Sequence, residues 1–336
     1  MSMTSRERVT RTLRFEGVDR PARNIWTLPA AYIGRDAELA TLLAGYPDDF
    51  GDGGYRDPVD ETPLYFPGEW TDPWGSRWQN IRPGMIGEVK YPAIDEWSRL
   101  AHWRPPYHLL GRGFQDVNRT CAENDLFNYI GTPRPFERLQ FVRGPENAYM
   151  DLAWGVKEVF TLLEMIHDYY LRHLEYVVRT DVDAIMFMDD WGSRDSLLIS
   201  PDMWVEYFKP LYRDYVEMAH SHGKFALMHS DGYIMDLYEH LIEIGVDAIN
   251  SQLFTMPIEE IGRRFKGRIT FWGEMDRQYI LPFGTPDEVR AAVERVRAVL
   301  WDDRGGVIGQ AEFNAGQPLE NIRAFLEAWW GPPEEV

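Results

Sequence analysis

The chain has 336 residues, and its 35 Lys and Arg against 54 Asp and Glu leave a formal net charge of −19. With 44% hydrophobic residues, including 13 Trp, it has enough core material for a globular fold, which excludes intrinsic disorder for most of the chain. This charge would repel a nucleic-acid backbone or an anionic bilayer, and no run of Lys and Arg forms a local exception, so we predict neither nucleic-acid binding nor membrane association.

The first predicted elements are a short helix and a short strand. Residues 5–16 are amphipathic, with Ser5 as candidate N-cap, and the run 24–26 suits a first buried strand. Residues 45–115 have a different composition, rich in Pro, Gly, Trp and Tyr. Long helices do not tolerate such spacing of turn-forming residues. We therefore interpret 45–115 as an insertion or lid built from short strands and ordered loops.

Short apolar runs alternate with helical patterns from about residue 126. The runs cover 126–130, 184–188, 225–228, 248–249, 269–272 and 307–308, and the helical patterns cover 155–179, 201–222, 234–244, 258–265, 286–300 and 318–330. This alternation is typical of a parallel sheet covered on both faces. Together with the run 24–26, it predicts an α/β fold: a single (β/α)8 TIM barrel over residues 1–336, with the insertion between the first strand and the regular units.

Polar residues gather directly after the predicted strands, where a barrel of this kind carries its active site. They are Asp189, Asp190, Trp191, His229, Asp231, Asn250, Gln252, Glu274 and Glu312. A single strand-end Asp is often a helix N-cap, and a single His is often structural. Recurrence at equivalent places in successive units instead indicates one site at the barrel mouth, suited to a divalent metal or to acid/base chemistry.

The cysteine count limits the chemistry of such a metal site. Cys121 is the single cysteine, so Cys-rich metal motifs and an intrachain disulfide are excluded, and His, Asp and Glu are the available ligands. No segment has the apolar length of a signal peptide or a membrane span. We expect a cytoplasmic protein, which suits a lone thiol.

Several motifs, collinear over nearly the whole chain, resemble the uroporphyrinogen decarboxylase superfamily. They are Arg6-Glu7-Arg8-Val9, Asp19-Arg20-Pro21, Asp72-Pro73-Trp74-Gly75, Asp189-Asp190-Trp191-Gly192, Ser200-Pro201, His229-Ser230-Asp231-Gly232, Gly245-Val246-Asp247, Phe271-Trp272-Gly273-Glu274 and Pro318-Leu319-Glu320-Asn321. The resemblance implies a (β/α)8 barrel with its site at the strand C-termini.

The resemblance implies two functional branches. True decarboxylases carry an Arg-rich stretch after the first strand, of which only Arg35 remains here as a remnant. The chain is more similar to the corrinoid-dependent methyltransferases, which place zinc on a strand-end His-x-Cys pair and a later Cys or acidic residue. The His corresponds to His229, Asp231 stands at the Cys position, Glu312 falls near the later ligand, and Glu274 is a fourth candidate.

The substituted ligand set favours one type of reaction. Thiolates donate electron density to zinc, whereas a His with carboxylates leaves a harder centre that polarises oxygen. The hypothesis is therefore methyl transfer from an oxygen or nitrogen donor to a separate corrinoid protein, with Asp190 and Asp189 as catalytic candidates. The candidate substrate-binding residues are Trp26, Trp191, Asn250, Gln252 and Arg35.

Two alternatives stay open at this stage. One is decarboxylation of uroporphyrinogen or a smaller carboxylate, with Asp189 or Asp190 steering the proton and Arg35 or Arg194 holding the acid. The other is a non-catalytic ligand-binding barrel whose insertion closes over an apolar ligand. The tryptophans between residues 70 and 103 suit three roles: covering the mouth, sealing a homodimer or docking a corrinoid protein.

Overall fold

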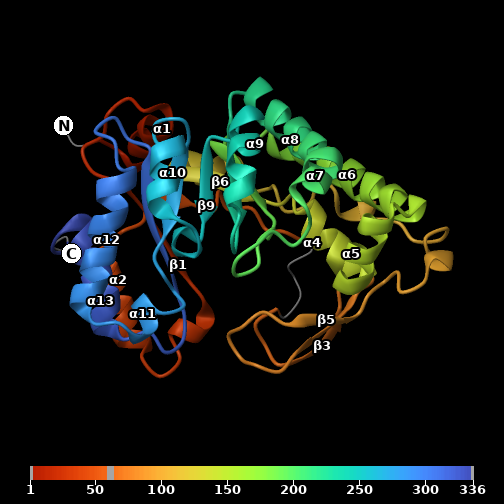
Figure 1. The fold of residues 1–336 in the computed structure, drawn as a ribbon, viewed down its shortest axis with the longest axis horizontal. Helices are drawn as coiled ribbons and strands as arrows, with labels where there is room; N and C mark the ends of the chain where they lie inside the picture. Colours follow the sequence, from red (N-terminus) through yellow and green to blue (C-terminus); the bar gives the residue numbers. More distant parts are fainter. Residues whose placement is uncertain (1–2, 59–63, 334–336) are drawn as a thin grey trace.

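The computed structural model describes residues 3–58 and 64–333. Eight parallel strands form a nearly closed barrel in the order β1-β11-β10-β9-β8-β7-β6-β2 (Figure 1). Their bounds are β1 (Ala22–Thr27), β2 (Phe50–Gly51), β6 (Phe127–Gly131), β7 (Ala184–Met188), β8 (Phe225–Ser230), β9 (Ala248–Ser251), β10 (Thr270–Glu274) and β11 (Val307–Phe313). The predicted (β/α)8 barrel is confirmed.

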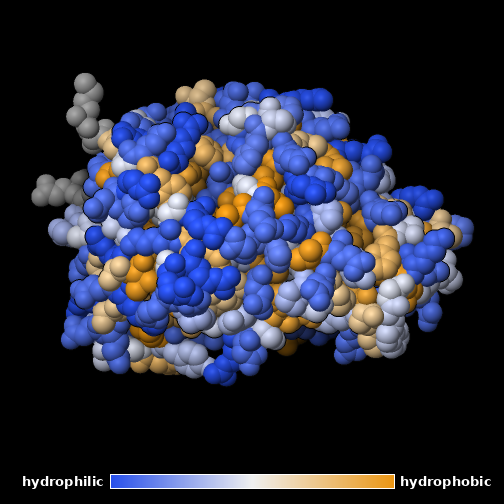
Figure 2. Space-filling view, turned by 45° about the horizontal axis from the view of Figure 1, so that its top comes forward, coloured by the Kyte–Doolittle hydropathy of each residue, from blue (hydrophilic) through white to orange (hydrophobic). Residues whose placement is uncertain are grey.

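The helices alternate with these strands and surround them (Figure 1). They are α1 (Ser5–Arg14), α2 (Asp36–Ala44), α3 (Val117–Glu123), α4 (Pro135–Arg143), α5 (Pro145–Trp154), α6 (Lys157–Val177), α7 (Pro201–Met203), α8 (Lys209–Ser221), α9 (Tyr238–Glu243), α10 (Ile258–Phe265), α11 (Ile280–Phe283), α12 (Pro286–Leu300) and α13 (Leu319–Trp330). None of these helices in the described ranges has the length and apolarity to cross a membrane. The face of the molecule shown in Figure 2 is mostly hydrophilic, with scattered apolar patches.

Helix starts follow local capping chemistry, with one exception to the prediction. Thr285 begins α12 with a full capping box to Glu288. At α1 the predicted cap Ser5 is wrong: the side chain of Thr4 accepts from the Glu7 N–H, and Ser5 already lies inside the helix. The Ser5 hydroxyl instead donates to Asp49, 2.7 Å away, so a long-range contact uses the group that the local pattern assigned to the cap.

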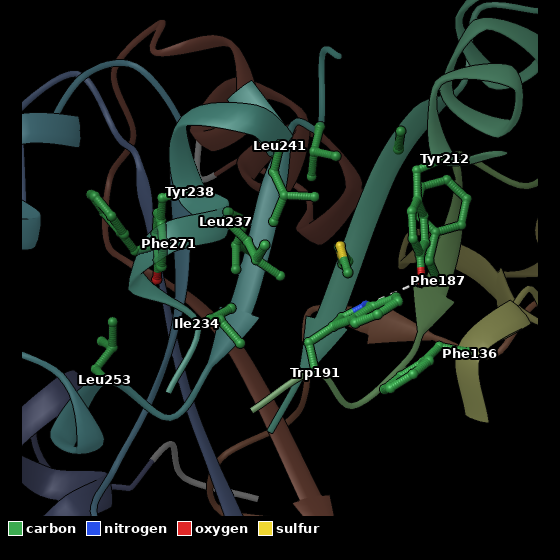
Figure 3. Packing of buried hydrophobic residues seen from close by; sticks show 14 of the residues in the cluster. Phe136, Phe187, Trp191, Tyr212, Ile234, Leu237, Tyr238, Leu241, Leu253 and Phe271 are labelled. Atoms are coloured by element: carbon green, nitrogen blue, oxygen red, sulfur yellow. Dashed lines mark hydrogen bonds between the residues drawn. The ribbon is translucent and has the colours of Figure 1, made fainter. Parts of the chain in front are cut away.

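Two apolar layers hold the barrel together. Inside the barrel, alternate strand residues pack into one cluster that α1 covers at the N-terminal end of the strands. This interior cluster contains Val9, Leu13, Ala22, Phe50, Phe127, Ala184, Met186, Leu227, Ala248, Trp272 and Ile308. A larger cluster fills the space between strands and helices. Figure 3 shows part of this outer layer, where Trp191 lies against Phe136 and its indole N–H donates to Tyr212.

β1 and β2 are the two edge strands of the sheet, and the described residues form no continuous hydrogen-bond ladder between them. Two aspartates bridge these two strands. Asp49 accepts from the Arg23 N–H at 2.7 Å, and Asp48 accepts from the Ile25 N–H at 2.8 Å. The carboxylates thereby bond two backbone donors of β1 that lack a neighbouring strand. This arrangement lets β2 consist of only two residues, too few to produce an apolar run in the sequence.

The insertion forms a small antiparallel sheet outside the barrel. Its strands are β3 (Gly68–Thr71), β4 (Arg77–Asn80) and β5 (Glu88–Tyr91), and in Figure 1 this orange sheet lies beside α4 and α5. The Ser76 hydroxyl donates to the Phe141 carbonyl at 2.7 Å, and the Arg138 guanidinium lies over the Trp74 ring. The predicted range 45–115 also contains β2, so the second barrel strand precedes the antiparallel sheet within that range.

Candidate metal-binding active site

Strand alternation decides which polar residues face the barrel mouth. Leu227 on β8 points into the barrel interior, so two residues later His229 points into the mouth, and Asp231 continues this face. On β7 the interior residue Met186 likewise sets Asp190 on the inner face and Asp189 on the outer one. The adjacent aspartates therefore have different environments.

Asp190, His229 and Asp231 form a compact group that can hold a metal ion, with one potential ligand atom from each within 4.8 Å of the others. His229 Nε2 lies 3.4 Å from Asp190 Oδ1 and 3.7 Å from Asp231 Oδ1. The buried Asp231 Oδ1 receives no hydrogen bond from any described residue. One imidazole nitrogen and two carboxylates are ligands that zinc accepts, so these residues fit a zinc ion.

The orientation of His229 is set by Asn250. The Asn250 amide donates to the Trp272 carbonyl at 2.9 Å, which directs its oxygen toward His229 Nδ1, 2.6 Å away. Nδ1 must therefore carry the proton, and in the neutral ring Nε2 keeps a lone pair. That lone pair faces Asp190 and Asp231, which is the geometry of a histidine prepared as a metal ligand.

The electrostatics of this group favour a cation. Burial alone would lower the pKa of His229, but the hydrogen bond with Asp190 and the charge of Asp231 outweigh it and raise the pKa to about 10. Burial opposes ionisation of Asp190, yet His229 holds its pKa below the usual value. The two carboxylates thus stabilise positive charge at Nε2, either as a proton or as a metal ion that replaces it.

Arg277 separates two predicted metal ligands from this group. Its guanidinium bonds Asp231 Oδ2 and lies 2.5 Å from Glu312 and 3.0 Å from Glu274. Burial raises the pKa of Glu274 to about 8. The predicted set His229, Asp231, Glu274 and Glu312 is therefore divided between the metal-capable group and an arginine cage. Sequence reasoning missed Arg277, although it follows Glu274 by three residues at the end of a barrel strand.

Glu137 is a second residue that the sequence reasoning missed. It lies in the first turn of α4, and its backbone N–H donates to Asp189 at 2.7 Å. Burial raises the pKa of Glu137 to about 8, and the charges of Asp190 and Asp189 act in the same direction. The strand-end rule applied to the run 126–130 would have pointed here, because β6 leads through Arg134 directly into α4.

Asp189 holds α4 in place. Its carboxylate accepts from the N–H groups of Phe136 at 2.8 Å and Glu137 at 2.7 Å, and from the Tyr212 hydroxyl. It is fully buried, and burial raises its pKa to about 7. Asp189 thus positions Glu137 beside the mouth, while its neighbour Asp190 belongs to the metal-capable group.

The predicted substrate-binding residues occupy different environments. Trp26 lies in the mouth, with its ring 5.2 Å from the His229 ring, and Gln252 accepts from the Gly232 N–H. Trp191 is fully buried and stacks on Phe136 with ring centres 4.0 Å apart. Only part of the predicted set therefore surrounds the metal-capable group.

Arg35 is engaged by backbone carbonyls of nearby segments. Its guanidinium donates to the carbonyls of Ala31, Asn314 and Gln317. These contacts connect the segment before α2 with the loop before α13. The one remnant of the arginine-rich stretch is thus used to join loops.

Two cavities are lined by residues that contact the metal-capable group or its neighbours. The rim cavity, about 190 Å³, is lined by Arg277, Gln252 and Arg194 among others, and reaches Asp231 through Arg277. The lid cavity, about 280 Å³, lies under the antiparallel sheet and is lined in part by Glu137, whose N–H bonds the neighbour of Asp190. Asp190, His229 and Asp231 are themselves not among the residues that line these two cavities.

This fold and site define a (β/α)8 barrel with ionisable side chains at the strand C-termini, the arrangement of barrel enzymes. The model of the uroporphyrinogen decarboxylase (URO-D) family matches residues 135–329. The chain belongs to this family, which confirms the resemblance inferred from its motifs.

One solved structure has a similar fold over nearly the whole chain. A methyltransferase from Methanosarcina mazei superposes with a TM-score of 0.68 at 15% sequence identity, covering 97% of this chain and 98% of that one. A D-psicose 3-epimerase gives 0.36 at 11% identity, covering 63% and 73%. A sugar phosphate isomerase/epimerase from Parabacteroides distasonis gives 0.35 at 9%, covering 64% and 73%. No curated protein sequence matches the chain.

Proposed function

We propose that this protein is a zinc-dependent methyltransferase that moves a methyl group from the oxygen or nitrogen of a small substrate to a corrinoid carried by a separate protein. The observation that carries the proposal is the orientation of the His229 ring. Its bond with Asn250 directs Nε2 toward Asp190 and Asp231. Membership of the URO-D family and the similar fold of the archaeal methyltransferase support it.

The proposed zinc ligands are Asp190, His229 and Asp231. Three protein ligands leave a position open for a substrate atom, as in catalytic zinc sites. Zinc bound there would act as a Lewis acid toward the atom that carries the methyl group. Glu274 and Glu312 take a different role from the predicted one: they hold Arg277, whose charge balances the acidic residues around Asp231.

Glu137 is the proposed proton donor. When the methyl–oxygen bond breaks, the methyl group passes to the nucleophilic acceptor, and the oxygen keeps the electron pair and requires a proton. A carboxyl group with a pKa of about 8 is protonated at neutral pH and can supply it. Asp190, the donor predicted from the sequence, has a lowered pKa and is ionised, which suits a metal ligand.

The decisive experiment measures zinc. Purified protein incubated with zinc and desalted should retain one zinc ion per chain by mass spectrometry of the metal, and His229→Ala should retain none. His222→Ala is the matched control, because His222 is exposed directly after α8 and bonds only Met218 and Ser221 among the described residues. Full retention by His229→Ala, or no zinc in the wild type, would refute the proposal.

A turnover assay tests the transfer itself. Wild-type protein with zinc, 2-methoxyphenol and free cob(I)alamin should produce methylcobalamin, visible by its absorbance. Glu137→Gln should bind zinc normally but lose about a hundredfold or more in rate, because the proton donor is missing. Equal rates for the two proteins would remove Glu137 from the mechanism.

A further inference from the structure

Arg277 joins carboxylates from three neighbouring strand ends of the barrel. Asp231 follows β8, Glu274 ends β10 and Glu312 lies in β11. The guanidinium donates from Nη2 to Asp231 Oδ2 and from Nη1 to Glu312 Oε1 at 2.5 Å, and its Nε lies 3.0 Å from Glu274 Oε1. Each nitrogen of the guanidinium therefore faces a different carboxylate, which a planar fork of donors can do and a single ammonium group cannot.

The two oxygens of Asp231 have different environments. Oδ2 accepts from Arg277, whereas Oδ1 is buried, receives no hydrogen bond from a described residue and lies 3.7 Å from His229 Nε2. A carboxylate can bind a cation through one oxygen or through both. Because Arg277 occupies Oδ2, only Oδ1 of Asp231 remains for an ion held together with His229.

Arg277 also occupies two glutamates that face the barrel mouth. Trp272 and Ile308 point into the barrel interior, so the strand period directs Glu274 and Glu312 to the same inner face, closer to the mouth. Both glutamates are potential oxygen ligands at the end of the barrel that carries the metal-capable group. Their pairing with Arg277 leaves this group with three protein ligands.

The number of available oxygen ligands distinguishes divalent metals. Zinc accepts a four-coordinate site with histidine and carboxylate ligands. Calcium takes six to eight oxygen ligands, and manganese(II) favours octahedral sites that are rich in oxygen. A group of three protein ligands with one imidazole therefore suits zinc, whereas the same mouth with Asp231 Oδ2, Glu274 and Glu312 released would suit the metals that require more oxygen atoms.

We propose that Arg277 is a positioning residue that sets the metal selectivity of this site. By holding one oxygen of Asp231 together with both glutamates, it limits the protein ligands to three and favours zinc over manganese(II). This inference rests on the proposed function, because it concerns the ion that the metal-capable group holds. Zinc generally binds more tightly than manganese(II) at any site with nitrogen and oxygen ligands, so the informative quantity is the change in the ratio of the two affinities.

Competition against a chromogenic chelator gives the Kd of zinc and of manganese(II) for the full-length protein. In Arg277→Met, the ratio of the manganese(II) Kd to the zinc Kd should fall about tenfold or more, because the released carboxylates supply oxygen ligands. A merely structural defect would weaken both metals alike, so an unchanged ratio would overturn the proposal. Arg263→Met is the matched control and should keep the wild-type ratio, because this side chain is 70% exposed and pairs with Glu260 in its own helix.

Arg277→Lys separates the charge from the fork geometry, and it keeps the proposal testable if Arg277→Met does not fold. Lysine keeps the positive charge but has one nitrogen, which cannot hold three carboxylates in the same way. The ratio should therefore fall in this variant as well, by about threefold or more. A wild-type ratio in Arg277→Lys would overturn the role assigned to the separate nitrogens of Arg277.

The same titrations distinguish this inference from the proposed function. If the wild type binds zinc and Arg277→Met keeps the wild-type ratio, the proposed zinc site stands and the selectivity role of Arg277 falls. If the wild type binds no zinc but Arg277→Met binds manganese(II), the proposed function falls, and the release of oxygen ligands by removal of Arg277 is supported.

Discussion

His229 Nδ1 lies 2.6 Å from the side-chain oxygen of Asn250, and this one contact sets the direction in which the other ring nitrogen faces. The Asn250 amide is in turn held by the Trp272 carbonyl on the neighbouring strand β10. Three adjacent strands thus define the tautomer of one imidazole before any ligand arrives. Such supporting bonds to a metal-binding histidine contribute to affinity as well as to orientation.

We predict that Asn250→Leu weakens zinc binding by about 10- to 100-fold, because the acceptor that fixes Nδ1–H is lost. Competition against a chromogenic chelator measures the affinity. Asn147→Leu on α5 is the control and should match the wild type, because among the described residues its amide bonds only the Arg143 carbonyl at the end of α4. An Asn250→Leu protein that folds and binds zinc with unchanged affinity would contradict this account of the tautomer.

The two adjacent aspartates should respond differently to the same substitution. Asp190→Asn should abolish stoichiometric zinc, and in the metal-free protein it removes the charge that stabilises protonated His229 at neutral pH. Asp189→Asn should keep zinc but lower the free energy of unfolding by about 1–3 kcal/mol, because an amide group cannot accept from all three donors of Phe136, Glu137 and Tyr212. Urea unfolding and metal analysis of both variants test the contrast, and identical behaviour would refute it.

Removal of the Arg277 guanidinium should destabilise the barrel. Arg277→Met leaves Asp231, Glu274 and Glu312 without their shared cation, and we expect a loss of about 3 kcal/mol at neutral pH, near the lower end for a buried pair because the Arg277 side chain is 17% exposed. Urea unfolding measures it. Arg194 lines the rim cavity together with Arg277, but its side chain is exposed. Arg194→Met should therefore change the free energy of unfolding by less than about 0.5 kcal/mol. Equal effects of the two variants would contradict the cage.

His173 should contribute to acid sensitivity. Burial lowers its pKa from 6.5 to about 4. His173 therefore binds a proton less readily in the folded state than in the unfolded chain. Protonation of the unfolded chain lowers the free energy of unfolding as the pH falls from 6.5 toward 4, and above pH 6.5 this loss is absent. At pH 4 the free energy of unfolding is lower by about 3 kcal/mol for this reason.

Urea unfolding across this pH range tests the assignment. His173→Phe, which suits the surrounding rings of Tyr55, Phe114 and Tyr169, should lose less stability between pH 6.5 and 4 than the wild type. His222→Phe, on an exposed histidine, should follow the wild type. A His173→Phe protein with the wild-type pH profile would show that another group controls the acid transition.

Much of the fold was predictable because its signals are local. The apolar runs of β6 to β11 and the Pro and cap pairs of α7 and α12 depend on residues within a few positions of one another. The strand β2 was not predictable in this way. Its two residues carry no periodicity. They pair with β6, and the preceding Asp48 and Asp49 bond β1 residues that lie more than twenty positions earlier.

The candidate site likewise has features that local sequence signals predict and features that depend on long-range contacts. The positions of Asp190, His229 and Asp231 at the ends of neighbouring strands could be predicted locally, because the two-residue period of a strand orients these side chains toward one mouth. The cation that each carboxylate contacts could not be predicted in this way. Arg277 takes Glu274 and Glu312, and Glu137 reaches the mouth from α4, because ion pairing and burial depend on distances across the fold that no local spacing encodes.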